Sequence, residues 1–557
     1  MCVVRGRLPV VSPMGRGSMS QRVRIGYIAV FVVGAVLMLA PALTDVFWFD
    51  EAYSIALARQ SLPEIWRIGA ADVHPLLYYV LLHGVCAVFG ESVVAYRLFS
   101  VAGMIATALL GPKLVRRDFG VRVGLLYSAL VLFTPYALFQ ATEIRMYSWA
   151  MFTVMLCFLM MLRIVYALRQ KSGEDVPFSW WLVFGISSFA AASLHYYALL
   201  SAFMLNLMVL IELVRVRAPR REALRFVASA VLQVALYAPW LLTLIAKMGD
   251  MTGGRFWIAP LGVKSLVQLV LYPLVTPAMS IGAARLFGDE ASALLPGVLM
   301  VVAVVLTLCA AGCLLAGNIA LQKSGERPAM ALRRGAVLYL GIIVLGGVVS
   351  FALGTTVLYY RYLVIALPPL LLALAVGVCK IRARGRWRAL AGAMLAVLAL
   401  FQTMSAVELA YDPANSAVRD AVLEVAYTDD GERRPVVSND IIALGTLATH
   451  ELVDGEAGET ASKLGPELVY ADDISGYWSA AYDCFAPALT CTEDTETLAS
   501  AAPNGEIIWL SRNQGEDGAA VKDLLECGLT KLDAQTIWSP YERDTYVITL
   551  LRVPDSR

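Results

Sequence analysis

The strongest constraint on this chain is a series of apolar segments that each run for about 20 residues, the length that a helix needs to cross a bilayer. Hydrophobic residues make up 59% of the 557 residues and charged residues only 16%, with a mean hydropathy of +0.67. A soluble globular protein is about one-quarter charged, so lipid must solvate much of this surface. The sequence predicts eleven membrane-spanning helices at residues 23–43, 98–115, 121–140, 147–167, 179–195, 196–214, 223–246, 292–318, 335–357, 361–379 and 388–409.

Charge is distributed unevenly along the chain. Of the 44 acidic and 45 basic residues, 27 and 10 lie in residues 412–557, so residues 1–411 hold 17 acids and 35 bases. This asymmetry fits a membrane region with basic cytoplasmic loops and an acidic, solvated domain on the opposite side. It gives no reason to expect a nucleic-acid partner.

One further apolar stretch, residues 75–90, decides the topology. If it lies in the interface without crossing, all six basic clusters fall on one side of the membrane, as the positive-inside rule requires. If it crosses, five of the six move to the outside. We therefore predict an interfacial helix here, with the N-terminus inside and the acidic tail outside. The clusters are Arg22/Arg24, Lys113–Arg122, Arg169/Lys171, Arg215–Arg225, Lys323–Arg334 and Lys380–Arg388.

The sequence thus divides into three predicted parts. Residues 1–22 are expected to be a cytoplasmic leader, in which Met19 could be the true start. Residues 23–411 form the membrane domain, whose first outer loop, 45–97, contains interfacial helices. Residues 412–557 alternate between strand and helix patterns and predict a small α/β domain with a partly parallel sheet.

More detailed expectations follow for two outer regions. Residues 263–274 could form a second interfacial helix. In the tail, Cys484 and Cys491 could close a short disulfide if that domain is outside the cell. The tail has no phosphate loop or nucleophile motif, which favours an accessory or acceptor-docking role over a second enzyme. Its expected strands are 435–438, 468–471, 506–510 and 545–553, with helices through 452 and over 518–527.

Polar residues gather at the predicted outer mouths of the spans. Ionisable groups at membrane depth cost roughly 2.5–3.5 kcal/mol each on insertion scales, so their presence requires a reason. Taken singly, each has a bland interpretation: Asp50 and Glu51 mark a helix exit, and Arg97 is a cation at a helix end. Taken together, they put acids, histidines and arginines on one rim, which suits a base that activates a nucleophile and cations that hold a phosphate.

The order of these residues forms a recognisable pattern. It resembles the membrane glycosyltransferases of the GT-C fold, most closely bacterial homologues of protein O-mannosyltransferases and aminoarabinose transferases. The resemblance is good over residues 45–197, thinner to 380 and absent in the tail; Leu76 stands where relatives usually carry a second proline. The segments that carry it are Phe49-Asp50-Glu51-Ala52-Tyr53-Ser54, His74-Pro75-Leu76-Leu77-Tyr78-Tyr79, Phe89-Gly90, Arg97-Leu98-Phe99-Ser100, Glu143-Ile144-Arg145-Met146-Tyr147-Ser148, Leu194-His195-Tyr196-Tyr197, Arg361-Tyr362-Leu363 and Pro368-Pro369.

The resemblance implies a sugar donor carried on a polyprenyl phosphate and an inverting transfer on the outer face of a bacterial plasma membrane. Asp50 would be the general base, and Glu51 would support it or position the acceptor. Residues expected to bind the donor's phosphate or sugar are Arg97, Glu143, Arg145, Tyr147, Arg361 and Tyr362, and those expected to line the site are His74, His195 and Tyr196. No cofactor is certain from the resemblance; some relatives with this fold need a divalent cation, and the acids here could hold one.

Two other classes of function fit parts of the pattern. A transporter or flippase of lipid-linked sugars would also need arginines near phosphate, but it predicts polar groups along the middle of several spans. A non-catalytic scaffold predicts that the outer-face clusters are dispensable. The enzyme interpretation is preferred, with a protein, a cell-wall polymer or a glycolipid as acceptor; mannose is the sugar that analogy suggests.

Overall fold

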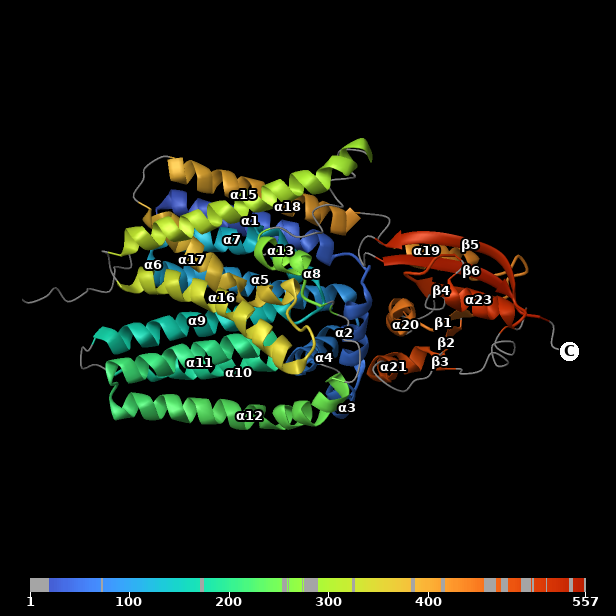
Figure 1. Ribbon diagram of the computed structural model, residues 1–557, viewed down its shortest axis with the longest axis horizontal. Helices are drawn as coiled ribbons and strands as arrows, with labels where there is room; N and C mark the ends of the chain where they lie inside the picture. Colours follow the sequence, from blue (N-terminus) through green and yellow to red (C-terminus); the bar gives the residue numbers. More distant parts are fainter. Residues whose placement is uncertain are drawn as a thin grey trace, which may run out of the picture.

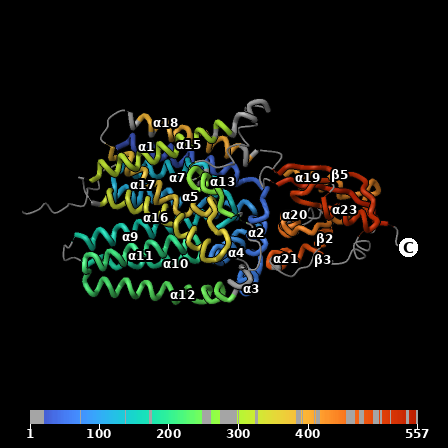
Figure 2. The backbone as a smooth tube through the Cα atoms, viewed as in Figure 1, coloured from blue at the N-terminus to red at the C-terminus, as the bar shows by residue number. Residues whose placement is uncertain are grey.

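The protein consists of a long helical bundle and a smaller sheet domain that follows it in the chain and lies beyond one end of the bundle (Figure 1, Figure 2). The computed structural model describes residues 20–554, except 72–73, 171–174, 253–257, 259, 273, 275–288, 323–325, 382–385, 412–415, 455–466, 472–478, 492–501, 503–504, 517 and 540–543. The predicted leader therefore lies largely outside the described residues.

The bundle is built from long apolar helices with short helices at one end. α9 is among the most buried of the long helices, and α5, α10 and α11 pack on it. The helices of this part are α1 (Gln21–Ala42), α2 (Phe49–Arg59), α3 (Leu62–Ala71), α4 (Leu77–Phe89), α5 (Val93–Leu110), the π-helix η1 (Gly111–Val115), α6 (Arg116–Phe119), α7 (Val121–Phe133), α8 (Pro135–Thr142), α9 (Tyr147–Gln170), α10 (Phe178–Leu194), α11 (Tyr196–Val216), α12 (Arg220–Thr252), α13 (Val263–Leu271), α15 (Asp289–Leu321), α16 (Glu326–Leu353), the 3-10 helix η2 (Tyr360–Ala366), α17 (Leu367–Lys380) and α18 (Arg386–Tyr411).

Each predicted span corresponds to helix in the described structure. Eight helices there are long and apolar enough to cross a membrane. The predicted spans at 121–140, 179–195 and 388–409 fall on shorter apolar helices. The first of these was expected to be continuous, but it breaks at Thr134, because Pro135 cannot donate a hydrogen bond within a helix and instead begins α8.

The short helices α2, α3 and α4 follow α1 and gather at one end of the bundle (Figure 1). The apolar stretch 75–90 forms the 13-residue helix α4, which is too short to span a bilayer. Residues 263–271 form α13, at the position expected for a second interfacial helix. Asp50 and Glu51 do not mark the exit of α1, which ends at Ala42; they lie in the first turn of α2, where acids are stabilised by the helix dipole.

The tail forms a six-stranded mixed sheet in the order β3-β2-β1-β4-β6-β5. The β3, β2, β1 and β4 strands run parallel, and β6 and β5 are antiparallel additions. The partly parallel α/β character is as predicted, whereas β5, α19, α21 and β3 were missed. The elements are α19 (Ala417–Val425), β1 (Val436–Ser438), α20 (Ile441–Asp454), β2 (Leu468–Tyr470), α21 (Ser479–Phe485), the 3-10 helix η4 (Ala486–Ala488), β3 (Thr490–Cys491), β4 (Glu506–Arg512), α23 (Ala519–Glu526), β5 (Thr530–Ser539) and β6 (Asp544–Arg552). No disulfide between Cys484 and Cys491 is present among the described residues.

The sheet domain packs directly on α2 through α20 and α21 (Figure 1). The Phe47 ring stacks on His450 with centroids 4.3 Å apart, and the Thr449 hydroxyl donates to the Ala52 carbonyl at 3.3 Å. Burial and the nearby Arg419 lower the pKa of His450 to about 3, so this stacked ring is neutral at neutral pH. A cavity of about 220 Å³ lies at this junction, lined in part by Asp45 and Arg419.

Candidate functional site

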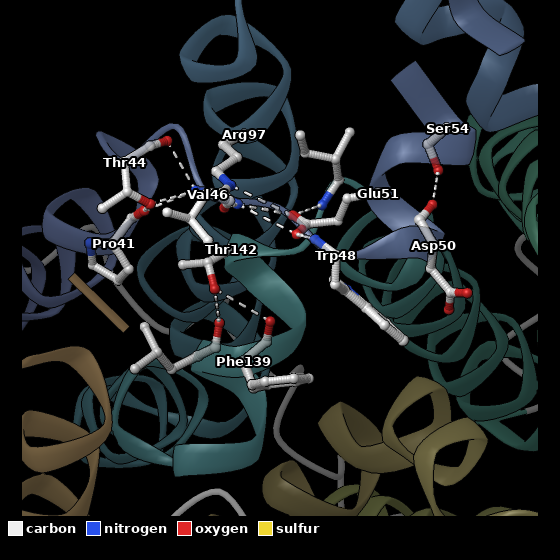
Figure 3. Close-up of polar contacts among 12 residues, drawn as sticks. Pro41, Thr44, Val46, Trp48, Asp50, Glu51, Ser54, Arg97, Phe139 and Thr142 are labelled. Atoms are coloured by element: carbon white, nitrogen blue, oxygen red, sulfur yellow. Dashed lines mark hydrogen bonds and ion pairs between the residues drawn. The ribbon is translucent and has the colours of Figure 1, made fainter. Parts of the chain in front are cut away.

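Adjacent acids on α2 point in different directions. Asp50 and Glu51 are separated by about 100° around the helix axis, so their side chains leave α2 on different faces of the helix. Figure 3 shows the Glu51 carboxylate turned toward Arg97 and the Asp50 carboxylate turned away from both. The two acids that the sequence presents as a pair therefore have separate environments.

Glu51 is fully buried and its carboxylate is occupied by several donors. It pairs with Arg97 at 3.3 Å and accepts the backbone N–H of Ile144 at 3.0 Å and of Trp48 at 3.3 Å. The Arg97 guanidinium also donates to Thr44 Oγ1 at 2.6 Å and to the Val46 carbonyl (Figure 3). These contacts tie α2 to α5 and to the loop before α9, and they favour a positioning role for Glu51 and Arg97 over direct contact with a donor.

Asp50 is more accessible and meets an arginine from a distant part of the chain. Its Oδ2 lies 3.1 Å from Nη1 of Arg361, at the start of η2, and the two side chains are 29% and 17% exposed. The Arg361 guanidinium also lies over the Trp48 ring, 4.7 Å from its centroid. An ion pair with this accessibility can open to admit a ligand, which the fully buried Glu51–Arg97 pair cannot do.

Arg145 reaches the same turn of α2 from the loop before α9. Its Nη1 donates to the Asp50 carbonyl at 3.3 Å, to the Ser54 hydroxyl at 3.4 Å and to the Tyr79 hydroxyl at 3.3 Å. Its Nη2 lies 3.4 Å from Nε2 of His74. Two arginines, separated by more than 200 residues in the sequence, thus converge on Asp50.

Glu143 lies two residues before Arg145 and is fully buried. Neither of its carboxylate oxygens has a hydrogen-bond partner among the described residues. Burial, opposed by Arg361 but reinforced by Glu51 and Asp50, raises the pKa of Glu143 to about 8. We refer to Asp50, Glu51, Arg97, Glu143, Arg145 and Arg361 as the acid–arginine cluster.

An aromatic wall adjoins this cluster. The His195 ring packs against Tyr362 and Tyr147, with centroids 5.0 and 5.5 Å apart, and lies 6.1 Å from the ring of His74. His195 Nδ1 accepts the Tyr197 backbone N–H at 3.0 Å, which caps α11 and fixes the ring. Tyr196 follows His195 at the start of α11.

Four side chains that were not predicted from the sequence contribute to the site. Trp48 stacks on Arg361, Ser54 and Tyr79 accept from Arg145, and Tyr197 packs on Tyr362 with centroids 5.1 Å apart. Ser54 lies one helical turn after Asp50, so the spacing i, i+4 could have indicated it. Tyr79 and Tyr197 lie within motifs that were noted and Trp48 directly precedes one, but aromatic side chains are equally typical of a membrane-interface belt.

Two acids of the site, Asp50 and Glu51, have protein partners in the described part of the chain. In the part of the chain that the structure describes, no group of three or more His, Cys, Asp or Glu side chains is arranged to hold a metal. Asp50 pairs with Arg361, and Glu51 is occupied by Arg97 and two backbone amides. No step below uses a metal.

Comparison with solved structures identifies the architecture. The aminoarabinose transferase ArnT from Cupriavidus metallidurans, solved bound to undecaprenyl phosphate, matches with a TM-score of 0.56 at 12% sequence identity, over 95% of this chain and 98% of ArnT. The chain has the GT-C fold. The expected resemblance is thereby confirmed at the level of fold.

Two further structures with the GT-C fold match more loosely. ArnT from Cupriavidus metallidurans in the apo state gives a TM-score of 0.47 at 13% identity, over 94% of this chain and 98% of that chain. The oligosaccharyltransferase AglB from Archaeoglobus fulgidus, in complex with an inhibitory peptide and a dolichol-phosphate, gives 0.41 at 11% identity, over 88% and 70%. No protein-family model matches the sequence, and no curated protein sequence matches it.

Proposed function

We propose that this chain is an inverting glycosyltransferase that moves a sugar from a polyprenyl-phosphate donor to a hydroxyl acceptor on the extracytoplasmic face of the plasma membrane. The observation that carries this proposal is the convergence of Arg361 and Arg145 on Asp50, from three separate elements of the GT-C fold. Lipid-phosphate binding by ArnT, which shares this fold, supports the choice of donor.

The geometry supplies the parts that such a transfer needs. One Asp50 oxygen would accept the proton of the acceptor hydroxyl, whose oxygen attacks the anomeric carbon as the bond from that carbon to the phosphate oxygen breaks. The electron pair of that bond leaves on the phosphate, so no general acid is required, unlike in glycoside hydrolysis. Guanidinium groups suit this leaving group because their planar fork binds oxyanions bidentately.

Arg361 would have two partners during the reaction. In the described state it pairs with Asp50, and an arriving phosphate would compete with that carboxylate for the same guanidinium. Release from Arg361 would leave the Asp50 carboxylate oxygen available to the acceptor hydroxyl as the donor is bound. Arg145 holds the backbone of the same residue and would keep the base in place.

The sidedness and the domain division also belong to this proposal. The basic clusters favour an inside location for the end of the bundle opposite α2, which would place Asp50 and the tail outside. We infer that residues 412–557 form an accessory domain, since α20 and α21 pack on the helix that carries Asp50. Acceptors would be protein hydroxyls, cell-wall polymers or glycolipids.

A transporter of lipid-linked sugars is the second candidate. It predicts polar groups within the spans, and Ser188, Asn206 and Gln233 do form a polar network between α10, α11 and α12. These groups are neutral and bond to one another, which ties the helices together and offers no charge to a phosphate. The enzyme is therefore preferred.

Replacement of the proposed base tests the function. Asp50→Asn should lower sugar transfer by roughly 10²–10⁴-fold, the usual contribution of a positioned general base, while the protein stays folded. Asp45→Asn is a matched control, because Asp45 lies on the same loop but is 78% exposed. The assay uses protein in lipid nanodiscs with a panel of radiolabelled polyprenyl-phosphate sugars, together with mass spectrometry of glycans from cells with and without the chain.

Two results would contradict the proposal. Near-normal transfer by Asp50→Asn would remove Asp50 as the base. Flux of a lipid-linked sugar across vesicles, without any covalent product from the panel or in the cells, would favour the transporter.

A further inference from the structure

Glu143 is an acidic side chain for which the transfer reaction has no obvious use. It lies between α8 and α9, is fully buried, and has no hydrogen-bond partner for either carboxylate oxygen among the described residues. Its neighbour Ile144 instead donates its backbone N–H to Glu51, 3.0 Å away. An ionised carboxylate left in such a place is strongly unfavourable, so the group needs either a partner or a proton.

The charged groups around Glu143 act on it through space, Arg361 most strongly, but none of the described residues donates a hydrogen bond to its carboxylate. Arg361 is directed to Asp50, and Arg145 is directed to the Asp50 carbonyl, Ser54 and Tyr79. Asp50 and Glu51 add negative charge, which opposes ionisation. The groups that act on Glu143 are Arg361, Glu51, Asp50, Arg145, Tyr78 of α4 and Tyr147 of α9. Burial is the largest effect, and the pKa of Glu143 rises to about 8.

The protonation of Glu143 sets the net charge of the acid–arginine cluster. The cluster holds three guanidinium groups, on Arg97, Arg145 and Arg361, and two ion-paired carboxylates, on Asp50 and Glu51. With Glu143 neutral the sum is one positive charge, and with Glu143 ionised it is zero. A sugar linked to a lipid through one phosphodiester carries one negative charge.

We propose that Glu143 is a positioning residue that stays in its neutral acid form, so that the cluster keeps one net positive charge for the phosphate of a lipid-linked donor. This inference rests on the proposed function, because it concerns the ligand of the same site. An ionised Glu143 would offer Arg361 a second carboxylate and would compete with the phosphate. Glu143 thereby acts through the arginines and touches no reacting atom.

Binding of undecaprenyl phosphate as a function of pH tests this inference. Wild-type protein and Glu143→Gln, both in lipid nanodiscs, are compared from about pH 6 to about pH 9, so that the ligand's own titration is common to both. The wild-type affinity should fall by roughly tenfold per pH unit above about pH 8 relative to the variant, because binding then requires uptake of a proton. Glu222→Gln is the matched control, since Glu222 is also buried but is paired with Arg225.

Thermal unfolding provides a readout that needs no ligand. The pKa of Glu143 is raised in the folded state, from the ordinary value of 4.5 to about 8. As the pH rises between these two values, the wild-type protein therefore loses stability relative to Glu143→Gln, and above about pH 8 the difference in stability between the two proteins is constant. The variant should therefore unfold at the higher temperature, by a margin that grows over this range. A merely structural role for the carboxylate would give the opposite sign.

Each outcome has a distinct meaning. Equal pH dependence of binding in the two proteins would overturn the inference. Loss of binding by Glu143→Gln at every pH would also overturn it, and this result would be expected if an ionised Glu143 held a cation. If neither protein binds undecaprenyl phosphate at any pH, the proposed function fails, and the unfolding comparison still decides whether Glu143 is neutral.

Discussion

Two buried acids at one end of the helical bundle are fully paired with arginines, whereas two acids at the other end, Asp50 and Glu143, are not, although Glu51 beside them is. At the end where α6 lies, opposite α2 (Figure 1), both Asp118 oxygens are taken by arginines: Arg163 at 2.7 Å and Arg327 at 3.3 Å. At the α2 end, Asp50 is partly open to its surroundings and Glu143 has no hydrogen-bond partner among the described residues.

A second carboxylate at the α6 end repeats the saturated pattern. Glu212 of α11 receives two hydrogen bonds from Arg169 and one from Arg334, all of 2.6–2.7 Å. A buried acid whose oxygens are all paired with cations holds helices together, and it has no oxygen available to bind a ligand. Incomplete pairing at the α2 end suits the proposed site, which would accept a phosphate and a proton. The contrast predicts stability effects at one end and activity effects at the other.

The largest expected effect lies at the saturated end. Asp118→Ala leaves the buried Arg163 guanidinium without its carboxylate and should destabilise the protein by about 3–5 kcal/mol, as is usual when one partner of a buried pair is removed. Thermal unfolding in detergent measures it. Asp175→Ala, which breaks an exposed pair with Arg221 in a loop at the same end, should cost only about 0–1 kcal/mol. A large loss of stability in Asp175→Ala, or no loss of stability in Asp118→Ala, would contradict the contrast between the two ends of the bundle.

Arg361→Gln should have the next largest effect, this time on rate. Loss of one charged donor to the leaving phosphate lowers kcat by about 10²–10³-fold, by analogy with the loss of a donor in an oxyanion hole. Steady-state kinetics with the active donor measures it, and unfolding should change little because Arg361 is partly exposed. Arg333→Gln, which removes an exposed arginine bonded to Asn318, is the control. Unchanged kinetics would separate Arg361 from the transfer step.

The smallest expected effect concerns the sheet domain. A Cβ added at Gly445 of α20 would lie 2.8 Å from the Phe49 ring and 3.0 Å from Phe485, so Gly445→Ala must displace the contact with α2. Since small misplacements of a reacting group are costly, we expect roughly a tenfold loss of kcat/KM. Gly515→Ala, where a Cβ meets nothing within 4 Å, should leave the rate unchanged. Normal transfer by Gly445→Ala would show that the domain does not position Asp50.

Much of the fold was accessible from the sequence because its determinants are local. Apolar length predicted the helices, and alternation with turn residues predicted β1, β2, β4 and β6. The prediction of one continuous helix over 121–140 was wrong because Pro135 begins a new helix. The β5 strand was missed because it is a largely exposed edge strand, so its sequence, Thr530–Ser539, lacks a clear apolar face.

The candidate site was predicted as a set of residues but not as an arrangement. Polar motifs at the ends of apolar segments selected Asp50, Arg145 and Arg361, which the structure brings together. The different roles of Asp50 and Glu51 depend on which face of α2 meets α5, and a sequence pair cannot show this. Tyr197, which was not selected, packs on Tyr362 of the site.

The sequence by itself determined that the chain is a polytopic helical protein with an α/β tail, because apolar length and periodicity are properties of consecutive residues. Only the tertiary structure decided which carboxylates are saturated and which are available, since each pairing joins residues far apart in the chain. Asp50 and Arg361 are 311 positions apart in the sequence, and no pattern of consecutive residues predicts that their side chains lie 3.1 Å from each other.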